Sequence, residues 1–329
     1  MAIPSGTNVE TGKPRYVIRP YDEKAWNDAM ARAGSLAPLL VPCGKCTGCR
    51  LDYSSQWAAR CMLELGYHDT SWFLTLTYDD AHVPRSYVAM PETGEAVEHL
   101  TLRYRDFQLF MKRLRKNSGQ KLRYYMAAEY GSLTYRPHYH AIIFGLELDD
   151  LEVYQRSAQG DTLYTSQFLQ DCWSVREGST VTPLGRVVIG AVTWQSCAYV
   201  ARYVTKKLMG PDAFFYDCHG MERPCTHMST NPGIGYQYYR DHPDLFEYEF
   251  INIATPDGGK KFPPPKYFDR KLEQDNPSLL AEIKARRKER GEARMQAELA
   301  RTDLDYMSYL AVKERALQER VRKLKREEV

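Results

Sequence analysis

Two histidines separated by a single residue, His138 and His140, are the side chains of this sequence best placed to bind a metal ion. Residues 138–144 are mostly apolar and aromatic and are followed by Gly145, which predicts a β-strand. Side chains alternate along a strand, so both imidazoles are expected on the same side of it. Two neutral imidazole nitrogens can then bind one cation. The alternative is a pair of hydrogen-bonded histidines on a half-buried strand.

The third ligand expected for this cation is Glu129, at the end of a preceding predicted strand, residues 122–129. A turn-forming segment separates the two strands, so we expect them to pair as an antiparallel hairpin. A carboxylate suits Mg²⁺ or Mn²⁺, and the imidazoles favour Mn²⁺ or another transition ion. Asp79 and Asp80, which end another predicted strand, are the competing candidates.

A second set of reactive side chains lies on a predicted helix, residues 193–209. Tyr199, Tyr203 and Lys206 are spaced i, i+4, i+7, which places them in one narrow sector of the helix. The opposite side is apolar and carries Cys197, Val200, Ala201, Val204 and Leu208. A phenol is a weak nucleophile near neutral pH because its pKa is about 10, but a metal-polarised phosphodiester and a nearby lysine can compensate. In a chain with 24 tyrosines, the pair can also be a coincidence.

Three segments, in this order along the chain, resemble the motifs of the HUH endonucleases: Phe73–Tyr78, Arg136–His140 and Tyr199–Lys206. The similarity is greatest to the two-tyrosine rolling-circle replication initiators of microviruses, including the gokushovirus branch. Tyr139 stands where these proteins usually have a bulky hydrophobic residue. The cysteine-rich segment Pro42–Arg50 also resembles the start of the phage proteins, so that the resemblance covers residues 42–210.

The resemblance implies a site and a reaction. Its metal ligands, nucleophiles and phosphate-assisting lysine would be His138, His140 and Glu129; Tyr199 and Tyr203; and Lys206. With Mg²⁺ or Mn²⁺ the protein would nick single-stranded origin DNA, form a covalent 5′-phosphotyrosine intermediate, and later transfer or ligate that strand end. A phage protein of this kind would act in the cytoplasm of the bacterial host, with the host replicative helicase as a candidate partner.

The resemblance also implies the fold class, which is α+β. We expect a central antiparallel sheet of the HUH, ferredoxin-like (RRM-like) type, with the histidine strand in its middle and the tyrosine helix packed nearby. The order of predicted strands and helices agrees with this class, because the histidine hairpin pairs antiparallel.

Two other functions are compatible with the same residues. A non-catalytic single-stranded nucleic-acid-binding module on the same scaffold would use the basic and aromatic side chains but no metal. A relaxase or transposase of the same superfamily is the other alternative. Relaxases usually carry a third histidine and an N-terminal tyrosine, and single-tyrosine transposases lack the second tyrosine on the helix.

Three cysteines within seven residues, Cys43, Cys46 and Cys49, have the spacing of metal ligands. Cys61, on the following predicted helix, can supply a fourth thiolate for a tetrahedral structural Zn²⁺ site. An iron–sulfur cluster and buried reduced thiols are the alternatives. A second grouping of metal-ligand types at residues 218–227 is interpreted as a coincidence.

Residues 101–125 carry eight basic side chains and one acidic side chain, an excess that is typical of a surface for a polyanion. Most of them lie on a predicted helix, residues 102–116, away from its apolar stripe. The side chains expected to contact DNA are Arg103, Arg105, Lys112, Arg113, Arg115, Lys116, Arg136 and Arg202. A solvated helix face is the alternative.

The 329 residues carry a net charge of +3 and are expected to form four parts. These are an N-terminal segment with the cysteines and a helix (1–66), the endonuclease core (67–210), a loop-rich extension (211–265) and a charged helical tail (266–329). The sequence has no signal pattern at its start and no apolar run long enough to span a bilayer, so reduced cysteines are expected. The oligomeric state is open.

Overall fold

The computed structural model describes the chain except for residues 11, 13, 21, 33–37, 40, 45, 90–92, 132, 158–159, 207–212, 256–257 and 324–329. It also leaves out the side chains of residues 23, 177, 202–206 and 323. The chain forms two compact units, Met1–Cys49 and Arg50–Val329. None of the helices in the described part of the chain has the length and apolarity that crossing a bilayer requires.

The first unit contains a small hairpin and a helix. Strands β1 (Ala2–Thr7) and β2 (Pro14–Ile18) pair antiparallel. Helix α1 (Glu23–Ala31) begins after Asp22, whose carboxylate accepts a hydrogen bond from the backbone N–H of Ala25 and so caps the helix. The cysteine cluster follows at the end of this unit.

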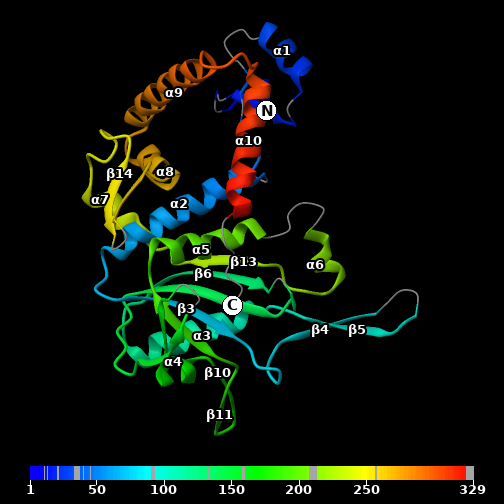
Figure 1. The fold of residues 1–329 in the computed structure, drawn as a ribbon, viewed down its shortest axis with the longest axis vertical. Helices are drawn as coiled ribbons and strands as arrows, with labels where there is room; N and C mark the ends of the chain where they lie inside the picture. Colours follow the sequence, from blue (N-terminus) through cyan, green and yellow to red (C-terminus); the bar gives the residue numbers. More distant parts are fainter. Residues whose placement is uncertain are drawn as a thin grey trace. The chain divides into compact units, whose positions relative to one another are not determined.

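The second unit is built on a sheet of seven strands among the described residues, with every neighbouring pair antiparallel (Figure 1). In spatial order the strands are β13 (Cys225–Met228), β6 (Arg123–Tyr130), β7 (Pro137–Phe144), β3 (Ser71–Thr77), β12 (Val187–Ala191), β9 (Thr162–Thr165) and β8 (Glu152–Arg156). The α+β class with a central antiparallel sheet is confirmed. The histidine strand β7 has neighbours on both sides, β6 and β3.

One face of the sheet packs against α3 (Tyr104–Ser118) and α4 (Gln167–Cys172), below the sheet in Figure 1. The apolar stripe of α3, which includes Phe107 and Phe110, is fully buried against this face. Tyr139 and Ala141 of β7 point to the same side and are also fully buried. Gly119 ends α3 in the left-handed conformation, at φ 66°, that favours glycine.

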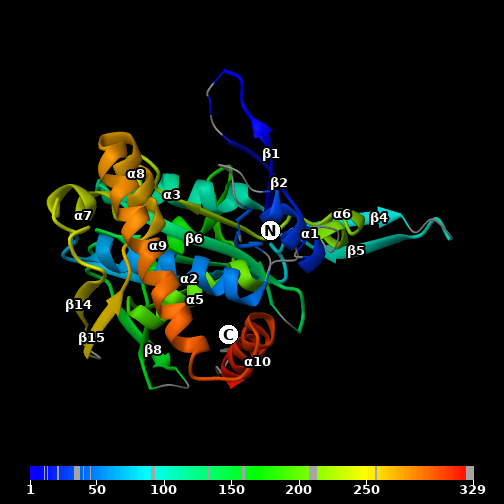
Figure 2. The ribbon, with the colours of Figure 1, turned by 90° about the horizontal axis from the view of Figure 1, so that it is seen from above.

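The other face packs against α2 (Thr47–Leu65) and α5 (Trp194–Lys206), which run side by side over the sheet (Figures 1 and 2). The hydroxyl of Ser54 in α2 donates to the carbonyl of Ala198 in α5, over 3.3 Å. Cys197, Val200 and Ala201 of α5 are fully buried between the helix and the sheet. These are the residues predicted for the apolar side of the tyrosine helix.

Two hairpins extend from this framework. Strands β4 (Arg85–Ala89) and β5 (Ala96–Leu100) form the first, which projects away from the sheet in both ribbon views (Figures 1 and 2). Strands β10 (Ser174–Glu177) and β11 (Thr180–Pro183) form the second. Helix α6 (Phe214–Cys218) precedes the edge strand β13.

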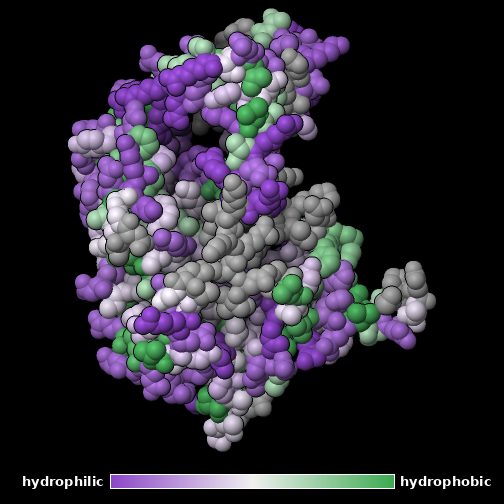
Figure 3. Space-filling view, in the orientation of Figure 1, coloured by the Kyte–Doolittle hydropathy of each residue, from purple (hydrophilic) through white to green (hydrophobic). Residues whose placement is uncertain are grey.

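The C-terminal third contributes a further apolar cluster that the sequence did not predict. It follows α7 (Tyr236–Asp241) and the hairpin of β14 (Ile251–Thr255) and β15 (Gly258–Phe262). Helices α8 (Lys266–Asp275) and α9 (Pro277–Leu299) bury Phe268, Leu272, Leu280 and Ile283 in this cluster. The start of the predicted charged tail is therefore core. The rest of α9 has a hydrophilic surface (Figure 3), as does most of α10 (Tyr306–Lys323).

Candidate metal centre and nucleophile

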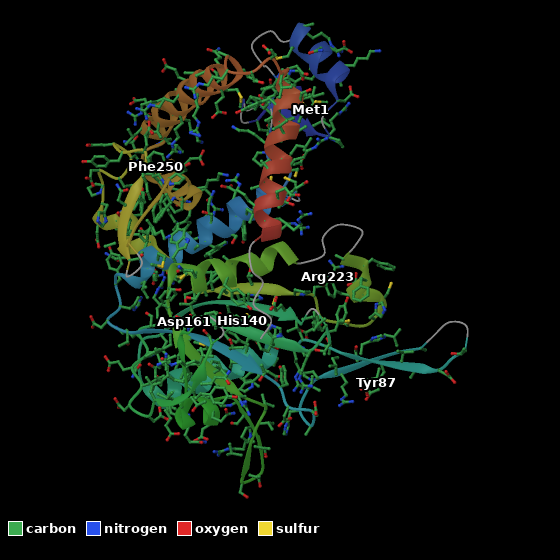
Figure 4. All side chains as sticks on the ribbon, viewed as in Figure 1. Met1, Tyr87, His140, Asp161, Arg223 and Phe250 are labelled. Atoms are coloured by element: carbon green, nitrogen blue, oxygen red, sulfur yellow. The ribbon has the colours of Figure 1, made fainter. Side chains whose placement is uncertain are left out.

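The pairing of β6 with β7 brings the three predicted metal ligands together. Glu129 lies directly opposite His138, and Ala127 lies opposite His140. Because side chains alternate, Glu129, His138 and His140 share the face of the sheet that α2 and α5 cover. Figure 4 shows His140 on the sheet, below α5. The predicted hairpin is thus present, with the carboxylate carried back to the histidines across the turn.

One ligand atom from each of these three residues lies within 4.8 Å of the others. A carboxylate oxygen of Glu129 is 2.7 Å from His138 Nε2 and 3.6 Å from His140 Nε2. His140 is fully buried, Glu129 is 5% exposed, and the His138 side chain is 14% exposed. The group is therefore shielded on one side and reached by solvent through His138.

The other ring nitrogens of the histidines are held by the protein. His138 Nδ1 lies 3.1 Å from the carbonyl oxygen of Arg136, which can only accept, so Nδ1 donates. His140 Nδ1 lies 3.1 Å from the hydroxyl of the buried Thr75 on β3. With a proton on Nδ1, each neutral ring presents the lone pair of Nε2 toward Glu129. Contacts of this kind orient histidines that bind metals in proteins.

The chemistry of this group fits a cation. Burial by itself would raise the pKa of the Glu129 carboxyl, but hydrogen bonds and charge from His138 and His140 outweigh it and lower the pKa to about 2. The carboxylate is ionised, and a nitrogen lone pair faces it at 2.7 Å. Such close electron-rich atoms need a proton or a cation between them. Two nitrogens and one oxygen suit Mn²⁺ or a similar first-row ion.

Tyr199 on α5 lies next to this group. Its ring meets the imidazole of His140 edge-on, with 5.3 Å between the ring centroids. The ring of Phe73 on β3 contacts it as well, with centroids 6.2 Å apart. The phenol is half-buried. The predicted convergence of a tyrosine with the histidine pair is therefore present for Tyr199.

The side chains of three other predicted site residues, Tyr203, Lys206 and Arg202, lie outside the described residues. Their backbone belongs to α5, which ends at Lys206. The start of this helix is fixed by Thr193 and Ser196, each of which accepts a hydrogen bond from the backbone N–H of the other, over 3.1 and 2.8 Å. This reciprocal capping sets the rotation of the helix and so places Tyr199 over the sheet.

The competing carboxylates are engaged elsewhere. Asp79 Oδ1 lies 2.7 Å from His82 Nδ1, and Asp80 forms an ion pair of 2.6 Å with Arg136. Arg136 also donates to the carbonyl of Tyr78, over 2.7 Å. Arg136 therefore anchors the loop after β3 to the start of β7. It was predicted as a DNA contact, but these hydrogen bonds engage its guanidinium within the protein.

The basic helix lies on the wrong side of the sheet to serve the metal group. Helix α3 packs on the face that carries Tyr139, opposite to the face of His138 and His140. Several of its basic side chains are engaged within the protein: Arg103 with Asp106, Arg105 with Gln108, Arg113 with the carbonyl of Cys172, and Arg115 with that of Leu122. Lys112 and Lys116 lie on the same helix. We therefore do not place these side chains at the site.

Cys43, Cys46 and Cys49 form a second group of close ligand atoms, with their sulfurs within 4.8 Å of one another. The Sγ atoms of Cys43 and Cys49 are 3.9 Å apart, and the backbone N–H of Cys46 donates to Cys43 Sγ over 3.2 Å. A tetrahedral zinc ion with bonds of about 2.3 Å places sulfurs about 3.8 Å apart, so the spacing fits. Gly44, at φ 73°, makes the turn between the first two cysteines.

Cys61 does not join this group, so the expected fourth ligand is not met. Its side chain is fully buried in the cluster between the helices and the sheet, where its thiol is hydrogen-bonded to that of Cys197. Burial raises the pKa of the Cys61 thiol well above its usual value. Among the residues that the structure describes, the 218–227 grouping forms no metal-ligand cluster either.

Comparisons with known proteins agree with the sequence motifs. The model of a family described as replication-associated protein ORF2 matches residues 71–208. The chain is 32% identical over 294 residues to replication-associated protein ORF2 of Spiroplasma virus 4, which covers 87% of this chain and 85% of the relative. It is 31% identical over 260 residues to replication-associated protein VP4 of Bdellovibrio phage phiMH2K, covering 76% and 73%.

No solved structure matches the chain significantly. The family resemblance inferred from the three motifs is nevertheless confirmed by these relatives, because the matched family model spans the strand, histidine and tyrosine segments together. This protein belongs to the family of phage replication-associated proteins that includes ORF2 of Spiroplasma virus 4.

Proposed function

We propose that the protein initiates phage DNA replication by nicking single-stranded origin DNA and remaining attached to the 5′ end through a tyrosine. The observation that carries this proposal is the position of Tyr199, edge-on to His140, at the side of a three-ligand metal group. A phenol beside a cation-binding group of this type can attack a phosphodiester. The replication-associated relatives support DNA as the substrate.

In the proposed reaction His138, His140 and Glu129 hold Mg²⁺ or Mn²⁺, which when bound would polarise the scissile phosphodiester. The phenolic oxygen of Tyr199 attacks the phosphorus and the bond to the 3′ oxygen breaks. The proton lost by the phenol is matched by the proton gained at the 3′-hydroxyl, so the products are a 5′-phosphotyrosine and a free 3′ end. Attack of a 3′-hydroxyl on the phosphotyrosine reverses the step and reseals a strand.

Tyr203 and Lys206 extend this scheme as proposals from their helical spacing. Tyr203 follows Tyr199 by one helical turn, so it can serve as a second nucleophile that cuts while the first tyrosine still holds a DNA end. Lys206 would place positive charge near the phosphate. The single-stranded substrate follows from the partial burial of the group, because a flexible, unpaired backbone can approach it more closely than a duplex.

We further propose that Cys43, Cys46 and Cys49 hold a structural metal, with Zn²⁺ the ion that best fits their spacing. The reaction would take place in the cytoplasm of the bacterial host, where a replicative helicase could supply unpaired template. The metal group and the cysteine group are independent, so loss of one leaves the other testable.

Incubation of the protein with a 3′-labelled library of single-stranded oligonucleotides and Mn²⁺ tests the proposal. We expect an SDS-resistant adduct, which the Tyr199→Phe, Tyr203→Phe double variant does not form and EDTA prevents. Tyr248→Phe, at an exposed tyrosine, is the control and should form adduct normally. The mass of the labelled peptide identifies the attached residue. An adduct in the double variant, or none in the unmodified protein, would refute the assignment.

A further inference from the structure

We propose that Arg186 and Tyr154 form a second DNA contact on the face of the sheet that carries the metal group. In this contact the guanidinium of Arg186 binds a backbone phosphate and the ring of Tyr154 stacks on a base. The inference rests on the proposed function for the identity of the ligand as a single DNA strand. It names where that strand continues beyond the scissile phosphate.

Arg186 lies in one row with the metal ligands. The backbone N–H of Thr77 donates to the carbonyl of Arg186 over 2.9 Å, Thr77 lies opposite His138, and His138 lies opposite Glu129. The row therefore crosses four neighbouring strands or their ends. With about 4.8 Å between strands, the backbone of Arg186 is about 10 Å from that of His138.

The side chain of Arg186 belongs to the same face as the histidines. Val187 and Ile189, its neighbours along β12, alternate with it and are buried against the face that α3 covers. Arg186 itself is exposed. The opposite, metal-bearing side of the sheet is thus where its guanidinium lies.

Tyr154 on the edge strand β8 holds this guanidinium in place. The Arg186 side chain donates a hydrogen bond to the Tyr154 hydroxyl, and its guanidinium carbon lies 5.2 Å from the centre of the ring. Tyr154 is 38% exposed, so its ring keeps a surface on which a base can stack. An arginine beside an aromatic ring is a combination that single-stranded nucleic-acid sites use for phosphate and base together.

The charge of Arg186 is not neutralised by a carboxylate. Among the described side chains no ion pair includes Arg186, whereas Arg103, Arg123 and Arg136 each pair with an acid. An exposed, uncompensated guanidinium is attractive to a phosphate, which it can bind through two parallel hydrogen bonds.

The backbone that carries Arg186 is positioned tightly. A Cβ atom at the preceding residue, Gly185, would lie 2.1 Å from the carbonyl oxygen of Thr77. The same carbonyl accepts a hydrogen bond of 2.8 Å from the indole of Trp173, and the side chain of Gln170 accepts one from the N–H of Val187. The distance between Arg186 and the metal row is therefore fixed by close packing rather than by a loose loop.

Equilibrium binding in EDTA tests this contact without requiring cleavage. The fluorescence anisotropy of a labelled single-stranded oligonucleotide is measured with the unmodified protein, Arg186→Ala, Arg186→Lys, Tyr154→Ala and Tyr154→Phe, over a series of salt concentrations. Loss of one phosphate contact should reduce the slope of log K against log salt by about 0.7 for Arg186→Ala. Arg186→Lys should keep most of the slope, because it keeps the charge.

Tyr154→Ala should weaken binding by roughly fivefold or more, because it removes a stacking surface, while Tyr154→Phe should bind nearly normally. Matched controls are Arg176→Ala, on the β10–β11 hairpin, and Tyr248→Ala, both at exposed positions, and thermal unfolding confirms that each variant folds. Unchanged affinity and slope in Arg186→Ala would overturn the contact. So would an equal loss in Arg176→Ala, which would indicate non-specific charge.

The adduct assay on the same variants separates the two proposals. A protein that forms no covalent adduct but loses affinity in Arg186→Ala retains the DNA contact and loses the nuclease assignment. A protein that forms adduct normally and shows no effect of Arg186→Ala retains the nuclease assignment and loses the contact. Pairing of the edge strand β8 with another polypeptide would appear as self-association of the protein insensitive to both substitutions, and would contradict the contact.

Discussion

The Nε2 atom of His138 lies 2.7 Å from a carboxylate oxygen of Glu129, although nine residues separate the two along the chain. The antiparallel register of β6 and β7 produces this contact, because it sets the two residues directly opposite each other. The neighbouring strand β3 adds Thr75 behind His140. Three consecutive strands of one sheet thus supply the ligands and the support of the metal group.

Thr75→Val tests whether this support matters for metal binding. Valine has a similar shape but cannot bond His140 Nδ1, so the ring loses its orientation and the affinity for Mn²⁺ should fall by about 10–100-fold. Thr75→Ser keeps the hydroxyl and should bind nearly as well as the unmodified protein. His140→Ala, which removes the ligand itself, should bind least.

Isothermal titration with Mn²⁺ measures these affinities, and thermal unfolding checks that each variant is folded. Normal binding by Thr75→Val would mean that burial alone orients His140. Unchanged binding by His140→Ala would argue against the metal group as a whole.

Cys46→Ser tests the cysteine cluster. The backbone hydrogen bond with Cys49 lowers the pKa of the Cys46 thiol, but burial and the neighbouring thiols of Cys43 and Cys49 outweigh it and raise the pKa. A cation offsets this mutual repulsion, so we expect about one zinc per chain in the purified protein and loss of it in Cys46→Ser. Elemental analysis by mass spectrometry measures the content.

Cys218→Ser, at an exposed cysteine outside the cluster, is the control and should keep its zinc. An iron–sulfur cluster would instead give visible absorbance and iron. A protein with neither metal after anaerobic purification would show that the three thiols are close without being ligands.

Glu64→Gln tests a buried carboxylate that joins distant parts of the second unit. Burial by itself would raise the pKa of Glu64, but hydrogen bonds from His68, Arg123 and the backbone N–H of Gly235 outweigh it and lower the pKa. The variant leaves the partly buried Arg123 without its carboxylate. We expect the free energy of unfolding near pH 7 to fall by about 2 kcal/mol.

The pH dependence of this loss has a definite sign. A carboxyl with a lower pKa in the folded protein stabilises it fully above its ordinary pKa of about 4.3, and this contribution disappears as the pH falls toward the folded value. Denaturant unfolding of both proteins should therefore show a difference that is constant near neutrality and shrinks in acid. A difference that grew in acid would contradict the assignment, and Glu282→Gln, at an exposed position on α9, should show none.

The sequence was sufficient for the local parts of the site. The two-residue period of β7 predicts that His138 and His140 share a face, and the turn before it predicts that Glu129 returns to them. The apolar stripe of α5 predicts which side of the helix is buried. Each of these inferences needs only the geometry of one strand, one hairpin or one helix.

The long-range parts could not be predicted. The position of Arg186 depends on the pairing of β12 with β3, which are more than a hundred residues apart. The face that α3 covers depends on which side of the sheet its connections reach, so its basic residues were assigned to the wrong place. Thr75 was missed because a threonine in an apolar strand gives no sign of its partner until β3 and β7 are paired.

Gly185 carries no reactive group, yet its backbone lies against that of Thr77, which separates His138 from Arg186 in the sheet. Any larger residue there would push two strand ends apart at the point where the DNA is expected to cross from the cation to the guanidinium. A replication screen of random variants should therefore find intolerant alleles at a glycine that touches neither the ion nor the nucleic acid.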